Sequence, residues 1–253
     1  MIIRKSPVEI DAMARAGRVV ADTLALIGEN VRPGVTTGEL DALAEEFITS
    51  QGGYPTFKGY RGYPASICAS PNDMVVHGIP GPYALEDGDI LSIDVGVTLG
   101  GFVADSAYTF TVGDVSGDTE RLLEACQAAL AAGIEQCRAG SRLSDISHAI
   151  QQVAEGAGFS VVRELSGHGV GRAMHEDPQI LNYGAPGRGP LLAEGMVFAI
   201  EPMINAGGPD IYLHDDRWSI STRDESRSAH FEHTVAVTQS GPRILTAAPV
   251  LLR

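Results

Sequence analysis

Cysteine is scarce in this 253-residue sequence, which contains only Cys68, Cys126 and Cys137. No two of them form a CxxC motif, and an odd number does not complete a disulfide framework. No apolar run reaches the roughly 18 residues of a membrane-spanning helix, and residues 1–7 lack the apolar stretch of a secretory signal. We therefore expect a cytoplasmic protein with reduced thiols and no membrane association.

Basic residues are also few, with 18 Lys and Arg against 32 Asp and Glu, for a formal net charge of −14. This balance argues against specific nucleic-acid binding, because phosphate contacts need clustered basic side chains. The hydrophobic content of 44% is that of an ordinary globular protein. The acidic excess serves either solubility or cation binding, and charge alone does not distinguish these two roles.

Two capped helices are predicted near the start of the chain. Residues 6–9, Ser-Pro-Val-Glu, form a capping box with proline at the first helical position. Apolar residues then recur at three- and four-residue steps until residues 32–34, Arg-Pro-Gly, end the helix. A second box at residues 36–39 opens a shorter helix, which ends at the glycine pair 52–53.

The same plan returns about 106 residues later. Further helices are predicted at about 120–137 and from about 143 to 156, and the segment 85–94 resembles the segment 192–201 at an offset of 107. This repetition indicates an internal duplication with a pseudo-two-fold axis. We expect one domain over residues 1–253, with halves of approximately 1–113 and 114–253. Antiparallel strands inside and helices outside make this an α+β fold.

Two aspartates lie in adjacent predicted strands, 90–98 and 102–112, joined at Leu99-Gly100-Gly101. In a hairpin centred there, Asp94 and Asp105 would face each other with Cβ atoms about 4.5–5.5 Å apart. Bare carboxylates at that distance repel each other. A divalent cation removes the repulsion, and a bridging carboxylate can hold two cations. The alternative is a solvated pair of acids, which the apolar neighbours disfavour.

Two glutamates occupy similar positions in the second half. Glu201 ends the apolar strand 196–200 and corresponds to Asp94 in the repeat, while Glu232 opens the strand 233–237. The duplication therefore predicts that acids from both halves approach the common axis.

The seven histidines differ in what their surroundings suggest. His148 and His214 are interpreted as structural or solvated, and strand alternation is expected to turn His230 and His233 away from the face of Glu232. The remaining three stand in short segments rich in glycine or proline, and none is a strong signal alone: His77, His168 and His175.

Together these segments closely resemble the bacterial type I methionine aminopeptidases over nearly the whole chain. The matching segments are Gly59-Tyr60-Arg61-Gly62-Tyr63-Pro64, His77-Gly78-Ile79-Pro80, Asp87 through Asp94, Asp105, Gly167-His168-Gly169-Val170-Gly171, Ile200-Glu201-Pro202-Met203 and Phe231-Glu232-His233-Thr234. The resemblance implies the pita-bread fold, with a central curved antiparallel sheet, helices outside and an internal pseudo-two-fold axis.

The resemblance also implies two divalent metal ions per chain. Asp94 would bind one ion, His168 and Glu201 mainly the other, and Asp105 and Glu232 would bridge both. Cobalt, manganese, iron(II) and zinc are the candidates, and the oxygen-rich ligand set favours the first three over a structural zinc. A monovalent cation is implied at the backbone of Asn72, Met74 and Ser228.

The implied activity is removal of an N-terminal methionine that precedes a small residue, with a hydroxide between the metals attacking the first peptide carbonyl. Glu201 would shuttle the proton, His175 would stabilise the oxyanion and His77 would contact the scissile amide nitrogen. Methionine would enter an apolar pocket made by Tyr60, Tyr63, Cys68 and Trp218. Trp218 as plain core is the alternative. Phe57 and Met174 border this pocket where better-known members often carry Cys and Phe.

Other members of the same fold remain alternatives. An Xaa-Pro peptidase has the same five ligands but usually an additional N-terminal domain, and a non-catalytic binding protein typically lacks some ligands. A type II enzyme is disfavoured, because only 32 residues separate His168 from Glu201. We expect a monomer that acts on the N-terminal segments of nascent proteins, and whether it associates with the ribosome is left open.

Overall fold

The structure is a computed structural model that describes residues 1–247. Its helices are α1 (Pro7–Asn30), α2 (Thr37–Ser50), α3 (Gly117–Gln136) and α4 (Leu143–Gly156), with a 3-10 turn η1 (Tyr60–Gly62). Both predicted capping boxes are present at the starts of α1 and α2. Within the described residues, no helix is long and apolar enough to cross a membrane.

The strands form four antiparallel sheets. Their bounds are β1 (Tyr54–Pro55), β2 (Cys68–Pro71), β3 (Met74–Val76), β4 (Ile90–Leu99), β5 (Phe102–Thr111), β6 (Ser160–Val161), β7 (Ser166–Gly169), β8 (Glu176–Leu181), β9 (Val197–Ile200), β10 (Met203–Asn205), β11 (Ile211–Leu213), β12 (Ile220–Thr222), β13 (Ser228–His230), β14 (His233–Thr238) and β15 (Gly241–Ile244). One sheet pairs β4 with β1, β2 and β5, and another has the order β15-β14-β9-β7-β8. Two smaller sheets have the orders β13-β10-β6 and β11-β12-β3.

The internal duplication is confirmed by matching hydrogen bonds in the two halves. Gly34 donates its backbone N–H to the carbonyl of Leu85 at 2.7 Å, and Gly140 donates in the same way to Leu192 at 3.0 Å. Isolated bridges repeat at the same offsets and join Thr36 with Ala84 and Arg142 with Leu191. Each half therefore places its second helix against the turn that leads into its long central strand.

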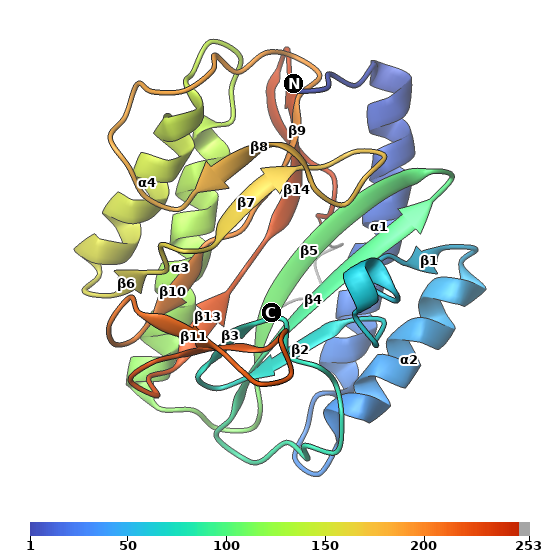
Figure 1. Ribbon diagram of the computed structural model, residues 1–253, viewed down its shortest axis with the longest axis vertical. Coiled ribbons are helices and arrows are strands. Elements are labelled where there is room, and N and C mark those ends of the chain that lie inside the picture. Colours follow the sequence, from blue (N-terminus) through green and yellow to red (C-terminus); the bar gives the residue numbers. More distant parts are fainter. Residues whose placement is uncertain (248–253) are drawn as a thin grey trace.

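The helices lie on the outside of the strands (Figure 1). In that view α1 and α2 flank the β4–β5 hairpin on one side, and α3 and α4 flank the second half on the other. Each half has its own apolar core. One core joins α1 and α2 to β4 and β5, and the other joins α3 and α4 to β9 and β14. The predicted α+β layout, with helices outside antiparallel strands, is confirmed.

The register of the β4–β5 hairpin differs from the predicted one. The loop consists of Gly100 and Gly101, both with positive φ, as a two-residue type I′ turn requires. Asp94 consequently lies opposite Ala107, and Asp105 lies opposite Gly96. The prediction that the two aspartates directly oppose each other was wrong, because it placed the turn centre one residue too early. A shift of two pairing positions keeps the same face, so they are diagonal neighbours.

The packing of α1 against the C-terminal segment leads to a stability prediction. A Cβ at Gly17 would lie 2.1 Å from the carbonyl oxygen of Leu245. We expect Gly17→Ala to lower the free energy of unfolding by about 1–3 kcal/mol, because α1 and the segment at Leu245 would have to move apart to make room for the added methyl group. Urea titration measures the change, with Gly117→Ala as control because a Cβ there meets nothing within 4 Å. A neutral Gly17→Ala would contradict this close approach.

Candidate metal centre

Asp94 and Asp105 project from one face of the β4–β5 hairpin into the interior. Their side chains are almost fully buried, with residue exposures of 9% and 3%. Burial raises the pKa of Asp94 to about 7. The pKa of Asp105 is raised well above its ordinary value by burial, and then by the negative charges of Glu232 and Asp94. The fold therefore keeps acids where bare negative charge is unfavourable.

The second half brings two glutamates to this face. Glu201 directly follows β9, and Glu232 lies in the break between β13 and β14. The backbone N–H of Glu232 donates to the carbonyl of Ala107 on β5 at 2.9 Å, which fixes the two halves together at the site. Burial, followed by nearby carboxylates, raises the pKa of both glutamates well above the ordinary value.

His168 on β7 presents one ring nitrogen to these acids. Its Nδ1 donates to the carbonyl of Gly169 at 2.9 Å, so Nε2 carries the free lone pair of the neutral ring. Nε2 lies 3.5 Å from Glu201 Oε1 and 3.8 Å from Asp105 Oδ2. Burial, and then the neighbouring His175, lower the pKa of His168 to about 4. A neutral imidazole oriented by a backbone carbonyl is the usual form of a histidine metal ligand.

These groups fit a divalent metal better than any pairing within the protein. Single ligand atoms of Asp105, His168 and Glu232 lie within 4.8 Å of one another. Oxygen atoms of Asp94, Asp105 and Glu232 are buried without a hydrogen-bond partner among residues 1–247. Unpartnered buried carboxylate oxygens are costly, whereas cations satisfy both their charge and their lone pairs. The other two predicted ligands lie next to these three residues: Glu201 is close to His168, and Asp94 is close to Asp105.

The predicted ligands share one cavity of about 240 Å³. Its wall includes all five of them and, in addition, the residues Phe57, His77 and His175. The structure therefore brings together residues that are spread over about 175 positions of the sequence. It does not place Tyr60, Tyr63, Cys68, Met174 or Trp218 in the wall of this cavity, and these residues form the cluster beside it.

His175 lies on the loop between β7 and β8, over the rim of the cavity. The Tyr60 hydroxyl is 2.8 Å from its Nδ1, and the two rings stack with centroids 5.4 Å apart. The centroid of the His175 ring is 4.2 Å from that of the His168 ring. When the Tyr60 hydroxyl donates to Nδ1, Nε2 carries the ring proton and is free to donate. Burial and then Arg61 lower the pKa of His175, which favours this neutral ring.

His77 approaches the cavity from the segment after β3, with a positive φ of 60°. Its ring packs edge-on against Trp218, with centroids 6.4 Å apart. Burial, and then the charge of His175, lower the pKa of His77 to about 4. The two histidines thus lie on the same cavity as neutral side chains.

The predicted methionine pocket is a cluster of apolar side chains next to Asp94. Cys68 on β2 pairs directly with Asp94 on β4, and burial raises the pKa of its thiol well above the ordinary value. Tyr63 packs edge-on against both Trp218 and Phe57, at centroid distances of 5.1 and 6.2 Å. These side chains belong to one hydrophobic cluster, with Tyr60 and Trp218 partly buried at its edge.

Met174 closes this cluster from the loop that carries His175. A Cβ at Gly96 would lie 2.6 Å from the Met174 methyl carbon, so the methionine covers the glycine that faces Asp105. Tyr60 has a different setting from the predicted one, because its hydroxyl contacts His175 and its ring stacks on that imidazole. Tyr60 therefore connects the apolar cluster with the polar rim.

The sequence of this chain matches a known family. Residues 11–239 match the sequence profile described as Metallopeptidase family M24. The chain belongs to metallopeptidase family M24. The match spans the five predicted ligands together with His77 and His175, so the family assignment covers the whole candidate centre.

Curated relatives of this M24 chain are methionine aminopeptidases. The chain is 53% identical to the methionine aminopeptidase of Clostridium perfringens over 246 residues, which cover 97% of this chain and 99% of the relative. It is 52% identical to methionine aminopeptidase 1 of Bacillus subtilis with the same coverage. The crystal structure of methionine aminopeptidase from Rickettsia prowazekii superposes with a TM-score of 0.96 at 46% identity, covering 98% of this chain and all of that chain.

More distant solved structures share the fold alone. Prolidase from Pyrococcus furiosus superposes with a TM-score of 0.76 at 21% identity. The match covers 98% of this chain but 66% of that chain. These similarities support the predicted pita-bread fold.

Several residues in the wall of the cavity were not predicted from the sequence. His230 lines it, with Nε2 3.8 Å from Glu201 Oε2 and without a hydrogen-bond partner. Strand alternation had been expected to turn His230 away, but Glu232 lies outside both strands and the alternation is interrupted there. Six further wall residues were not predicted as site residues, although Met203 belongs to a matching segment: Val76, Glu164, Leu165, Ser166, Gln179 and Met203.

The remaining predicted positions are not in the wall of the cavity. The backbone N–H of Ser228 donates to the carbonyl of Asn72 at 2.9 Å, so two of the three residues expected to bind a monovalent cation are in contact. Met74 begins β3 beside them. His148 on α4 donates from Nδ1 to the Gly184 carbonyl at 3.1 Å, and His214 Nε2 lies 2.9 Å from the Ser221 hydroxyl.

Proposed function

We propose that this chain is a methionine aminopeptidase, which removes an N-terminal methionine when the next residue is small. One observation carries the proposal: the five predicted metal ligands and the neutral histidines His77, His175 and His230 line a single cavity next to an apolar cluster. Relatives about half identical over nearly their full length, named methionine aminopeptidases, support it. Cleavage of Xaa-Pro bonds is disfavoured, because the prolidase similarity extends to the fold only.

Two divalent metal ions would be held by Asp94, Asp105, His168, Glu201 and Glu232. The unpartnered buried oxygens of Asp94, Asp105 and Glu232 support this set. Bound divalent ions supply Lewis acidity and lower the pKa of water in such sites. Cobalt, manganese and iron(II) suit four carboxylates and one imidazole better than a structural zinc does.

The protein's own groups would then direct the hydrolysis. Glu201 is proposed to accept the proton of the attacking water and to pass it to the leaving amine. His175 would donate from Nε2 to the oxygen of the carbonyl under attack, while Tyr60 holds the opposite ring nitrogen. His77, which also lines the cavity, would contact the scissile amide nitrogen. These roles require the neutral rings that burial favours.

The methionine side chain would enter the cluster of Phe57, Tyr63, Cys68, Met174 and Trp218, with Tyr60 at its edge. Its apolar walls and its position beside Asp94 support this assignment. A thioether is flexible and polarizable, and it packs favourably against aromatic rings. Substrate selection would therefore combine an apolar first side chain with a free amino terminus.

We also propose a bound monovalent cation, a cellular location and an oligomeric state for the enzyme. We place a monovalent cation at the backbone of Asn72, Met74 and Ser228, supported by the Asn72–Ser228 contact. The chain would act in the cytoplasm as a monomer on the N-terminal segments of nascent proteins. Residues 1–253 would form one catalytic domain, with halves meeting near residue 113.

Peptide hydrolysis tests the proposed function. Metal-free protein supplied with Co(II) or Mn(II) is expected to release methionine from Met-Ala-Ser and to leave Ala-Pro and Met-Pro dipeptides intact. Chromatography of the products measures both reactions. Release from Met-Leu-Ser should be much slower, because the second side chain must fit beside the acids. Inactivity of the metal-loaded protein on Met-Ala-Ser would overturn the proposal, and cleavage of the Xaa-Pro bonds would replace it with the alternative.

A further inference from the structure

We propose that the buried ion pair between Lys5 and Glu176 positions His175 for the reaction. This inference rests on the proposed function. Lys5 precedes α1, and Glu176 directly follows His175 at the start of β8. The Lys5 ammonium lies 2.6 Å from Glu176 Oε2, and the side chains are only 5% and 8% exposed. The pair thus connects the N-terminal segment to the loop that carries a catalytic residue.

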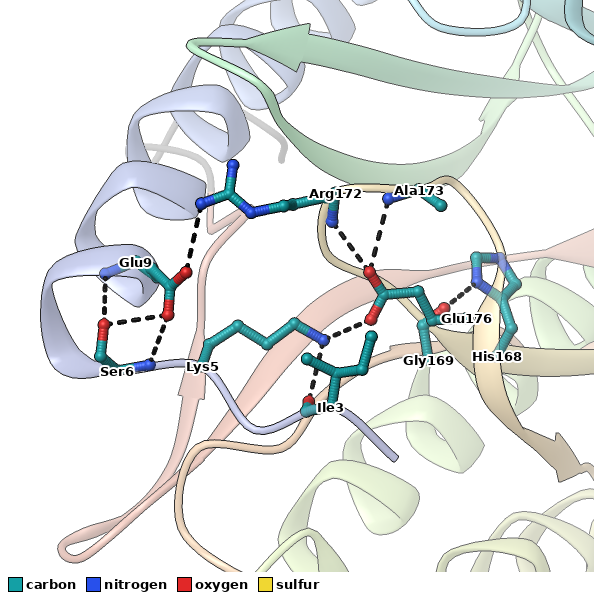
Figure 2. Close-up of polar contacts among 9 residues, drawn as sticks. All are labelled: Ile3, Lys5, Ser6, Glu9, His168, Gly169, Arg172, Ala173 and Glu176. Atoms are coloured by element: carbon teal, nitrogen blue, oxygen red, sulfur yellow. Dashed lines mark hydrogen bonds and ion pairs between the residues drawn. The ribbon is translucent and has the colours of Figure 1, made fainter. Parts of the chain in front are cut away.

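Glu176 organises the conformation of this loop. Its Oε1 accepts hydrogen bonds from the backbone N–H groups of Arg172 at 2.9 Å and Ala173 at 3.4 Å. Figure 2 shows these amides and the Lys5 ammonium converging on the one carboxylate. A Cβ at Gly171 would lie 2.5 Å from both Glu176 Oε1 and Lys5 Cε, so the loop packs tightly around the pair. The chain between β7 and β8 is therefore folded around a single charged group.

Lys5 is itself fixed by the rest of the structure. Its backbone N–H donates to the carbonyl of Gly195 at 2.6 Å, in the turn that leads into β9 and Glu201. Its ammonium also donates to the carbonyl of Ile3 at 3.1 Å. Because both ends of the pair are anchored, the salt bridge connects the His175 loop to the N-terminal segment and, through the Lys5 backbone, to the turn that leads into β9.

His175 needs such support because its own position is exposed. It lies on a surface loop, and its ring contacts Tyr60 and the His168 ring. A buried ion pair contributes little net stability compared with apolar side chains of similar volume, and specification of one conformation is a recognised alternative role. A small displacement of a catalytic group reduces turnover strongly. Lys5 and Glu176 are accordingly positioning residues, which act through His175.

Steady-state kinetics of Lys5→Met test the inference. With Mn(II) and Met-Ala-Ser, we expect kcat to fall about 10–100-fold, as for other groups that orient catalytic residues. KM should stay within about threefold and metal content should be unchanged. Arg4→Met is the matched control, because Arg4 is exposed and donates to the Glu194 carbonyl without contacting the loop. Its kcat should equal that of the unmodified protein.

A double-mutant cycle with His175→Ala separates positioning from a general structural effect. If Lys5 acts through His175, adding Lys5→Met to His175→Ala should lower kcat by less than about twofold. Equal falls in both backgrounds, a loss of bound metal or an unchanged kcat of Lys5→Met would each overturn the inference. Should Lys5→Met fail to fold, Glu176→Gln carries the same cycle. Inactive unmodified protein would instead refute the proposed function, so the two failures are distinguishable.

Discussion

His175→Ala is expected to lower kcat for Met-Ala-Ser by about 10²–10³-fold, the usual effect of losing one donor to a developing oxyanion. The ring lies over the cavity rim, 4.2 Å between centroids from His168, and Tyr60 holds Nδ1 so that Nε2 remains available. KM should change little, because the donor would act mainly on the transition state. Stopped peptide assays over a range of concentrations separate the two constants.

Metal content distinguishes this role from that of a ligand. We expect His175→Ala to retain the metal stoichiometry of the unmodified protein, measured by elemental analysis after gel filtration. His148→Ala is a suitable control, since His148 lies on α4, contacts the Gly184 carbonyl and does not line the cavity. If His175→Ala loses metal, His175 is a ligand and its assignment as an oxyanion donor is wrong.

Removal of divalent metal is expected to abolish methionine release and to make the stability of the protein fall as pH rises above about 6.5. Without cations, burial raises the pKa of Asp94 to about 7, and those of Asp105, Glu201 and Glu232 rise well above their ordinary values. The folded protein then holds protons that the unfolded chain has released. Stability falls by about 1.4 kcal/mol per pH unit for each such proton.

Below about pH 6.5 the buried histidines also make the stability depend on pH. Burial lowers the pKa of His77 and His168 to about 4, so their contribution to stability is present above their ordinary value of 6.5 and lost as pH falls below it. Above about pH 6.5 the buried acids dominate the balance, and the buried thiols add to it only as pH approaches their ordinary value of 9. The decline in stability should continue until the pH exceeds the raised pKa values of the buried acids.

Urea titrations at pH 6.5, 7.5 and 8.5 measure this effect, with chelator and with Mn(II). The free energy of unfolding should decline over this range in chelator and remain nearly level in Mn(II), because cations replace the protons. Glu232→Gln removes one buried acid and should reduce the slope in chelator. A metal-free protein whose stability is constant from pH 6.5 to 8.5 would show that the carboxylates are already ionised and solvated.

Local sequence was sufficient to predict much of the fold. The capping boxes at Ser6 and Thr36 defined the starts of α1 and α2, because cap chemistry depends on residues three positions apart. The repeat at offsets of 106 and 107 predicted equivalent turns at Gly34 and Gly140, since a duplicated sequence forms the same local hydrogen bonds. The positions of Asp94 and Glu201 at equivalent points of the two halves followed from the same repeat.

Only the tertiary structure decided how these elements meet. The hairpin register depended on positive φ at both Gly100 and Gly101, which placed Asp105 opposite Gly96 instead of Asp94. The break before Glu232 turned His230 into the cavity, because strand alternation does not continue through an interruption. Lys5 and Glu176, 171 positions apart, form a pair that no local pattern contains. The sequence by itself predicted most of the polar residues that line the cavity, and long-range packing decided which atoms face one another.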